Sequence, residues 1–119
     1  MFGFEKLEVW KKAIGYADAT YTVTRSFPDD ERFGLRVQLQ RAAVSISSNV
    51  AEGSSRTSKK DFARFVELSY GSLMETISQL CIAQNQKFVA RENASDLRKR
   101  AEELARMLSE LKGTLLRKN

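Results

Sequence analysis

One stretch of the sequence, residues 41–53 with its lead-in from 35, restricts the folds open to the chain because it is apolar on two sides. It reads L-R-V-Q-L-Q-R-A-A-V-S-I-S-S-N-V-A-E-G. At about 100° per residue, one helical face carries a first apolar set, which is Leu35, Leu39, Ala42, Ala43, Ile46 and Val50. A second apolar strip consists of Val37, Val44 and Ala51. An ordinary surface helix has one apolar stripe and a broad charged back, so we expect this helix to contact neighbours around much of its circumference.

Two arrangements explain the second apolar strip. The helix is either the most buried one in a monomer, or it has one face in a bundle and the other in an oligomer. A four-helix bundle leaves each helix partly exposed, which favours the oligomer. Small residues let helices approach closely, and Ser45, Ser48 and Ala51 fit such an interface.

A polar stripe separates the two apolar strips and consists of Gln38, Arg41, Ser45, Asn49 and Glu52. It could be a ligand groove in which Arg41 holds an anion and Glu52 acts as acid or base. It could instead be a hydrogen-bonded network that fixes the helices, with Glu75 or Gln79 as partners. Arg41 and Glu52 are about 16 Å apart along the helix, so each needs its own partner in this chain or another subunit. We favour the structural or interface role.

The composition indicates one helical domain over residues 1–119. The chain has 42% hydrophobic and 29% charged residues, one proline and six glycines, which favours long helices. It has no histidine, and Cys81 is its only cysteine. These counts exclude a disulfide within the chain, a Cys/His zinc cluster and a nucleophile paired with histidine. We therefore expect no catalytic residues, cofactor or metal.

Nothing in the sequence predicts a membrane or secretory segment. The opening M-F-G-F-E-K-L-E is interrupted by charges before an apolar core region forms, unlike a signal peptide. No apolar run is long enough to span a membrane. We expect a cytoplasmic protein.

The first predicted helix covers residues 5–26. Its apolar positions repeat at spacings of three and four, typical of a bundle, and are Leu7, Trp10, Ile14, Ala17 and Tyr21. Phe27-Pro28 should end it. Asp29 or Asp30 is predicted to cap the second helix, and Gly53 is predicted to end that helix in the left-handed conformation.

The third predicted helix follows a capping box at Ser58 to Asp61 and runs towards Phe88. Its predicted apolar face consists of Phe62, Val66, Tyr70, Leu73, Ile77, Leu80 and Cys81. We interpret Trp10 and Cys81 as core residues.

Asn93 or Ser95 is predicted to cap the fourth helix. Its heptad positions are Leu97, Ala101, Leu104, Leu108, Leu111 and Leu115. Cations near its end complement the helix dipole, and they are Lys112, Arg117 and Lys118. Four helices with short connections predict an all-α, antiparallel up-down-up-down four-helix bundle.

The net charge of +5 lies entirely in the second half of the chain. Residues 1–55 hold seven basic and seven acidic side chains, whereas residues 56–119 hold thirteen and eight. Four of these basic residues lie at the start of the third helix, namely Arg56, Lys59, Lys60 and Arg64. Lysines there oppose the helix dipole, so an anion such as a phosphate backbone would suit them. Arg98 and Lys99 are further candidate nucleic-acid contacts. A solvated surface is the alternative.

Three segments carry a family resemblance. F-E-K-L-E-V-W-K-K-A (4–13), F-G-L-R-V-Q-L-Q-R-A-A-V-S-I-S-S-N-V-A-E-G (33–53) and F-A-R-F-V-E-L-S-Y-G-S-L-M-E (62–75) resemble the four helix bundle proteins encoded within intervening sequences of bacterial 23S ribosomal RNA genes. The chain is also similar to the accessory variability determinant proteins of diversity-generating retroelements. The resemblance implies assembly into a homopentamer. For the retroelement relatives it implies a basic surface that binds nucleic acid and a reverse transcriptase.

We therefore expect a non-enzymatic, homo-oligomeric helical protein that binds RNA or a ribonucleoprotein partner. The assembly stripe would comprise Arg41, Ser45, Asn49, Glu52 and Glu75. The alternative is a structural scaffold that binds protein without nucleic acid. An enzyme is the third hypothesis, and loss of an activity in a Glu52→Gln variant would support it.

Overall fold

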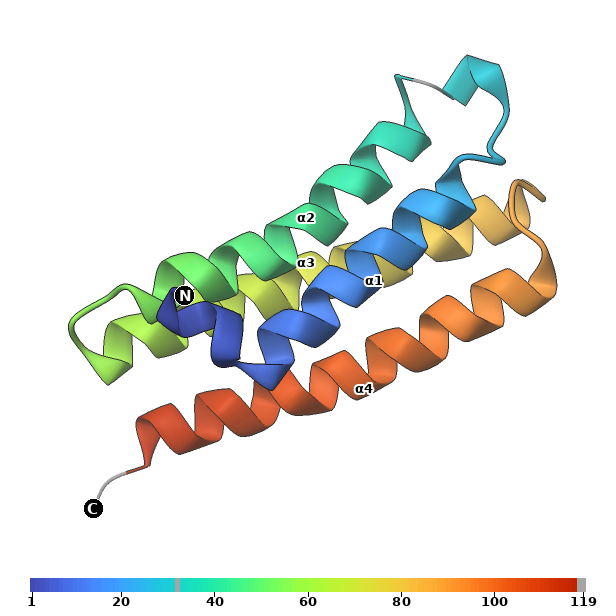
Figure 1. The fold of residues 1–119 in the computed structure, drawn as a ribbon. Coiled ribbons are helices and arrows are strands. Elements are labelled where there is room, and N and C mark those ends of the chain that lie inside the picture. Colours follow the sequence, from blue (N-terminus) through green and yellow to red (C-terminus); the bar gives the residue numbers. More distant parts are fainter. Residues whose placement is uncertain (32, 118–119) are drawn as a thin grey trace.

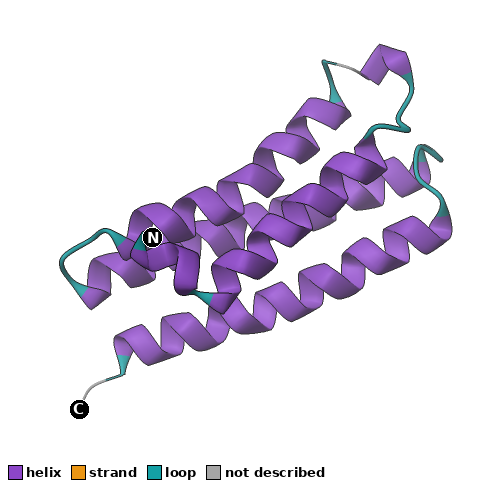
Figure 2. Ribbon diagram, viewed as in Figure 1, coloured by secondary structure: helices purple, strands orange, loops and turns teal. Residues whose placement is uncertain are grey.

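The chain forms four long helices and two short helical turns in a computed structural model that describes residues 1–31 and 33–117. The α-helices are α1 (Glu8–Thr24), α2 (Leu35–Ser54), α3 (Lys59–Asn85) and α4 (Arg91–Leu116). The 3-10 turns are η1 (Gly3–Lys6), before α1, and η2 (Asp29–Glu31), between α1 and α2. The described residues contain no strand (Figure 2). The predicted all-α class with four helices is therefore confirmed.

The helices lie lengthwise beside one another and form a rod (Figure 1) with extents of 50 × 22 × 21 Å. α2 and α3 share the largest contact, α4 packs mainly on α3, and the contact between α1 and α4 is the smallest of those between α-helices. The largest fully buried side chains come from α2, α3 and α4, and include Leu39, Ile46, Leu73, Leu80, Leu104 and Leu108. No helix among the described residues is both long and apolar enough to cross a membrane.

The N-terminal region differs from the single predicted helix over residues 5–26. The chain forms η1, extends at Leu7 and only then enters α1. Leu7, Trp10 and Ile14 are only half-buried, and Tyr21 is exposed. Ala17 is buried as predicted, and the other buried residues of α1 are Val9, Ala13, Tyr16, Thr20 and Thr24.

Threonine hydroxyl groups explain why the buried face of α1 was missed. Thr20 Oγ1 donates to Tyr16 O at 2.8 Å, and Thr24 Oγ1 donates to Thr20 O at 2.8 Å. A buried hydroxyl is tolerated when it is hydrogen-bonded. A pattern of apolar residues alone therefore places the core face one position away from its true place.

Two predicted helix caps are wrong. Asp29 and Asp30 lie in η2, and α2 begins after Gly34, where the Glu31 carboxylate accepts the Leu35 N–H at 3.2 Å. The α4 helix begins at Arg91, so the predicted caps Asn93 and Ser95 lie inside it. Lys118, predicted to complement the dipole of α4, lies outside the described residues.

Ser58 caps α3 as predicted, but only this half of the predicted capping box is found among the described residues. Ser58 Oγ accepts the backbone N–H of Asp61 at 3.0 Å. This bond satisfies one of the N–H groups that the first turn of a helix leaves without a partner.

Gly53 does not end α2 in the left-handed conformation, because α2 continues to Ser54 and no described glycine has a positive φ. Gly53 is instead a point of close helix packing. A Cβ there would lie 2.6 Å from Phe65 Cβ and 2.9 Å from Phe62 Cδ1. The glycine therefore lets α2 approach α3.

The predicted apolar face of α3 is partly wrong. Tyr70 and Cys81 are exposed, whereas Ser69 and Thr76 are fully buried. Ser69 Oγ donates to Ile46 O of α2 at 2.8 Å. On α4, Leu97, Ala101, Leu104 and Leu108 are buried as predicted, and Leu111 and Leu115 pack against the core.

Candidate functional surfaces

A hydrogen-bonded network joins the polar stripe of α2 to α3. The Asn49 Nδ2 donates to Ser45 O at 2.9 Å and to Ser45 Oγ at 3.0 Å. The Ser72 hydroxyl donates to Ser45 Oγ at 2.9 Å. The network reaches α3 through Ser72 and not through the expected Gln79, whose Oε1 is buried without a hydrogen-bond partner.

The two ends of the polar stripe are exposed to solvent. Arg41 and Glu52 are exposed, and so is Glu75 on α3. Among the described residues none of these three side chains forms an ion pair. The partners predicted for Arg41 and Glu52 are not found among the described residues.

Apolar side chains are exposed beside this stripe. Val44 on α2 is 42% exposed, and Leu68 and Ile82 on α3 are 52% and 48% exposed. Val37 and Ala51, the other members of the second apolar strip, are half-buried. The bundle therefore covers the first apolar face of α2 and leaves part of the second uncovered.

The basic residues at the start of α3 form one group around the loop 55–58. The guanidinium groups of Arg56 and Arg64 lie 4.6 and 5.7 Å from the ring centroid of Phe65, close enough for cation–π attraction. Lys59 and Lys60 are exposed, and neither pairs with a carboxylate among the described residues.

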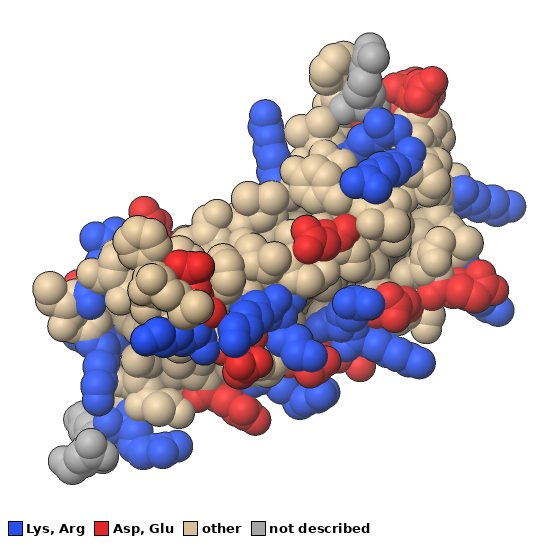
Figure 3. All heavy atoms as spheres, in the orientation of Figure 1, with Lys and Arg blue, Asp and Glu red and all other residues tan. Residues whose placement is uncertain are grey.

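The six predicted nucleic-acid contacts do not form one patch. Arg98 lies near the C-terminal end of α3, with its Nη1 3.9 Å from Cys81 Sγ. Lys60 and Cys81 are about 32 Å apart along α3, so Arg98 and Lys99 lie towards the other end of the rod from Lys59 and Lys60. In Figure 3, blue and red side chains alternate along the lower edge of the molecule. On α4, Arg100 pairs with Asp96 at 3.0 Å.

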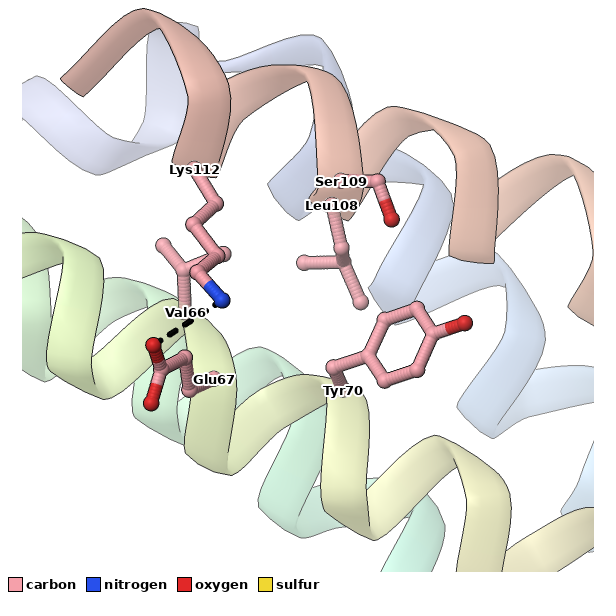
Figure 4. Close-up of a pocket in the computed structure, with 6 residues that line it drawn as sticks. All are labelled: Val66, Glu67, Tyr70, Leu108, Ser109 and Lys112. Atoms are coloured by element: carbon pink, nitrogen blue, oxygen red, sulfur yellow. Dashed lines mark ion pairs between the residues drawn. The ribbon is translucent and has the colours of Figure 1, made fainter. Parts of the chain in front are cut away.

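A groove between α3 and α4 was not predicted. It has a volume of about 420 Å³ and is lined by Val66, Glu67, Tyr70, Leu108, Ser109 and Lys112 (Figure 4). Lys112 Nζ pairs with Glu67 Oε1 across it at 2.9 Å. This ion pair links α3 to α4, and both of its side chains are exposed to solvent over about half of their surface. The apolar pattern of α3 does not predict this groove, because it assigns Tyr70 to the core, whereas Tyr70 is exposed.

The phenol of Tyr16 is an ionisable group buried in the core. Burial raises the pKa of the Tyr16 phenol, and its hydrogen bond to Thr76, at 2.8 Å, partly opposes this shift in pKa. That pair lies in the core and does not line the groove between α3 and α4. No cluster of His, Cys, Asp or Glu among the described residues is arranged to hold a metal ion.

The fold and its surfaces define an all-α protein of four long helices with one uncovered helix face. The chain belongs to the family of 23S rRNA-intervening sequence proteins, whose model matches residues 5–110. Its fold is similar to the crystal structure of a protein with unknown function from the S23 ribosomal protein family of Bacteroides thetaiotaomicron VPI-5482. That similarity has a TM-score of 0.80 at 19% sequence identity and covers 87% of this chain and 96% of that chain. No curated protein matches the sequence. The predicted family is confirmed, and the structural similarity supports the fold alone.

Proposed function

We propose that this chain is a non-enzymatic, homo-oligomeric helical protein that binds RNA or a ribonucleoprotein partner through a basic surface. The observation that carries the proposal is the basic group around the loop 55–58. Lys59 and Lys60 are exposed at the N-terminus of α3 and pair with no described carboxylate. Their charges add to the positive end of the helix dipole, where a phosphate group is favoured.

The family makes the RNA of a 23S rRNA intervening sequence the first polyanion to test. The chain belongs to a family of proteins from intervening sequences of 23S rRNA. We propose that the RNA contacts comprise Arg56, Lys59, Lys60 and Arg64, with Arg98 and Lys99 as a second group towards the other end of the rod.

We further propose that residues 1–119 are a single domain with antiparallel up-down-up-down topology. The short connections between consecutive helices support this. A homopentamer follows from the family resemblance, with Arg41, Ser45, Asn49, Glu52 and Glu75 as its assembly stripe. A cytoplasmic location accords with the single cysteine of the sequence.

RNA binding can be tested by fluorescence anisotropy with a labelled transcript of a bacterial 23S rRNA intervening sequence. If phosphates are contacted, the logarithm of the association constant falls linearly with the logarithm of salt concentration. The double variant Lys59→Gln/Lys60→Gln should weaken binding and reduce that salt slope by about 2, since each lost phosphate contact contributes about 1.

For comparison, Arg98→Gln/Lys99→Gln removes the same charge from the second proposed group of RNA contacts. If this variant lowers the slope and the lysine variant does not, the RNA binds at the Arg98 end of the rod and not at the loop 55–58. Binding that is absent, or insensitive to salt, with several RNAs would contradict the proposal.

A protein scaffold without nucleic acid is the second candidate, favoured by the exposed apolar side chains of Val44, Leu68 and Ile82. Cross-linking in the native cell, followed by RNA sequencing and mass spectrometry, separates the two functions. RNA cross-linked near the N-terminus of α3 would favour RNA binding. A defined protein partner without RNA would favour the second.

A further inference from the structure

The outer surfaces of α2 and α3 carry charged and apolar side chains in a regular order along the rod. We call the position of a residue along the long axis of the rod its height. Three contacts relate the heights of the two helices, namely Ser45 with Ser72, Ile46 with Ser69, and Gly53 with Phe65. As residue numbers rise along α2, the numbers of the contacted residues fall along α3. A height on one helix can therefore be assigned to a residue on the other from the rise of 1.5 Å per residue.

Opposite charges occur at equal heights on the two helices. Arg41 lies about 6 Å from Ser45 along α2, and Glu75 lies about 4.5 Å from Ser72 in the same direction. Eleven residues further along each helix, Glu52 on α2 lies near the height of Arg64 on α3. The outer edge of α2 thus carries a positive and then a negative group, and that of α3 carries a negative and then a positive group at the same heights.

These charges are largely unpaired within the chain. Arg41, Glu52 and Glu75 are exposed and form no ion pair with a described residue. Arg64 has an exposed ion pair with Asp61 at 4.0 Å, and its guanidinium lies 5.7 Å from the ring centroid of Phe65. The four side chains are therefore available to a partner of complementary charge.

Large and small residues also alternate between the edges. On α2, the exposed Val44 lies near the height of Gly71 on α3, and the small Ser48 lies near the height of Leu68. Gly71 is exposed, and a Cβ there would meet no atom within 4 Å. A glycine within a helix costs up to about 1 kcal/mol against alanine, and nothing within the chain requires one at this position. Close approach by another chain would.

We propose that the α2 edge of one copy (Arg41, Val44, Ser48 and Glu52) binds the α3 edge of another copy (Arg64, Leu68, Gly71 and Glu75). This inference rests on the proposed homo-oligomer and adds where the copies meet and how they are oriented. Arg41 lies opposite Glu75 of the next copy, and Glu52 lies opposite its Arg64. Val44 packs at its Gly71, and Ser48 accommodates its Leu68.

The arrangement also fixes the direction of the symmetry axis. Rotation about an axis parallel to the helices leaves every residue at its own height, so the matched groups meet whatever the number of copies. A closed ring around such an axis uses the α2 edge against one neighbour and the α3 edge against the other. Because this inference places Arg64 at the interface, the proposed RNA contacts near the loop 55–58 become Arg56, Lys59 and Lys60, without Arg64.

The test is a charge reversal on each edge. Arg41→Glu and Glu75→Arg each place like charges opposite one another between copies. Each variant alone should lose assembly, with a mass by light scattering close to the 13.5 kDa of one chain. Both positions are exposed and unpaired, so circular dichroism should show the helical content and thermal unfolding of a folded chain.

Mixing the two variants shows that the pairing is between copies. One variant carries two carboxylates at this height and the other carries two guanidinium groups, so contacts between the variants are complementary. With one variant isotopically labelled, native mass spectrometry should detect species that contain both. The double variant Arg41→Glu/Glu75→Arg should also recover the parent mass.

Ser48→Trp tests the packing without changing charge and should also reduce the mass. Ser95→Trp, at an exposed position of α4, is the matched control and should leave the mass unchanged.

If the parent is itself a single chain in solution, the proposed homo-oligomer is wrong and this interface is wrong with it. If the parent is oligomeric but the reversal variants and Ser48→Trp keep its mass, the homo-oligomer stands and this interface is wrong. RNA binding is scored separately with Lys59→Gln/Lys60→Gln, which should keep the parent mass.

Discussion

At the scale of single residues, Gly53 shows how one missing side chain sets the approach of two helices. The space that a Cβ would need is taken by Phe65 Cβ and by the ring of Phe62. The Phe65 Cβ is attached directly to the backbone of α3, so it cannot rotate away. Any larger residue at this position must push the helices apart.

We therefore expect Gly53→Ala to lower the free energy of unfolding by about 1–3 kcal/mol, the usual cost of overpacking. Urea denaturation followed by circular dichroism measures this change. Gly113→Ala is the control, since Gly113 lies in α4 with no atom within 4 Å of an added Cβ. It should be stabilising by about 0.5–1 kcal/mol, because alanine is the better helix former. Gly53→Ala with parent stability would refute the close-packing role.

Tyr16 makes stability depend on pH at the alkaline end. Its buried phenol has a pKa above the ordinary 10.0. Once pH exceeds about 10, the unfolded chain loses this proton while the folded chain retains it, so the free energy of unfolding falls as pH rises. Below that pH the contribution is fully present.

The measurement is urea denaturation between about pH 8 and 11, comparing the parent with Tyr16→Phe. The variant should be less stable at neutral pH by about 1 kcal/mol, because its hydrogen bond to Thr76 is lost. Its stability should then fall less steeply with rising pH. Equal slopes in the two proteins would show that Tyr16 is not the group responsible, since lysines and the other tyrosines are common to both.

At the scale of helices, two serines that were both predicted as caps show that the local sequence fixes the start of one helix but not of the other. Ser58 is both predicted and observed to cap α3, whereas Ser95 has the same predicted role for α4 but lies inside that helix. Ser58→Ala should therefore cost about 1 kcal/mol of unfolding free energy. Ser95→Ala should change it by no more than about 0.5 kcal/mol. Chemical denaturation of both variants compares the two serines directly, and equal effects would contradict the assigned helix boundaries.

The same scale shows what could be predicted from the sequence. The first apolar face of α2 and the heptad of α4 are confirmed, because large aliphatic side chains dominate both. The core face of α1 was misplaced because Thr20 and Thr24 satisfy their hydroxyls within the helix. The polar stripe of α2 was recognised, but its link to Ser72 depends on the height of α3, which no local pattern contains.

At the scale of the whole molecule, the candidate surfaces depend on distances that the sequence does not reveal. The predicted basic residues fall into two groups that lie far apart on the rod, and the groove beside Tyr70 exists only where α3 and α4 meet. The exposed face of α2 and α3 is likewise a product of packing, since both helices contribute their other sides to the core.

Unequal packing among the helices predicts an order of local opening. α2 and α3 share the largest contact, and α1 and α4 touch each other least. Amide hydrogen exchange should therefore be slowest in the buried turns of α2 and α3 and faster in α1 and α4, because regions of low contact density open more easily. Hydrogen exchange measured by mass spectrometry checks this order. Slower exchange in α1 than in α2 would contradict it.

The exposed thiol of Cys81, beside Arg98 near one end of α3, is the only one in the chain. A maleimide dye would therefore label the natural sequence at one defined position. The dye would lie about 32 Å along the helix from Lys60, a distance suited to resonance energy transfer. An RNA with an acceptor dye at one end would then give weak transfer when that end binds at the lysines and strong transfer when it binds beside Arg98. The unmodified chain can thus report which end of the rod an RNA approaches.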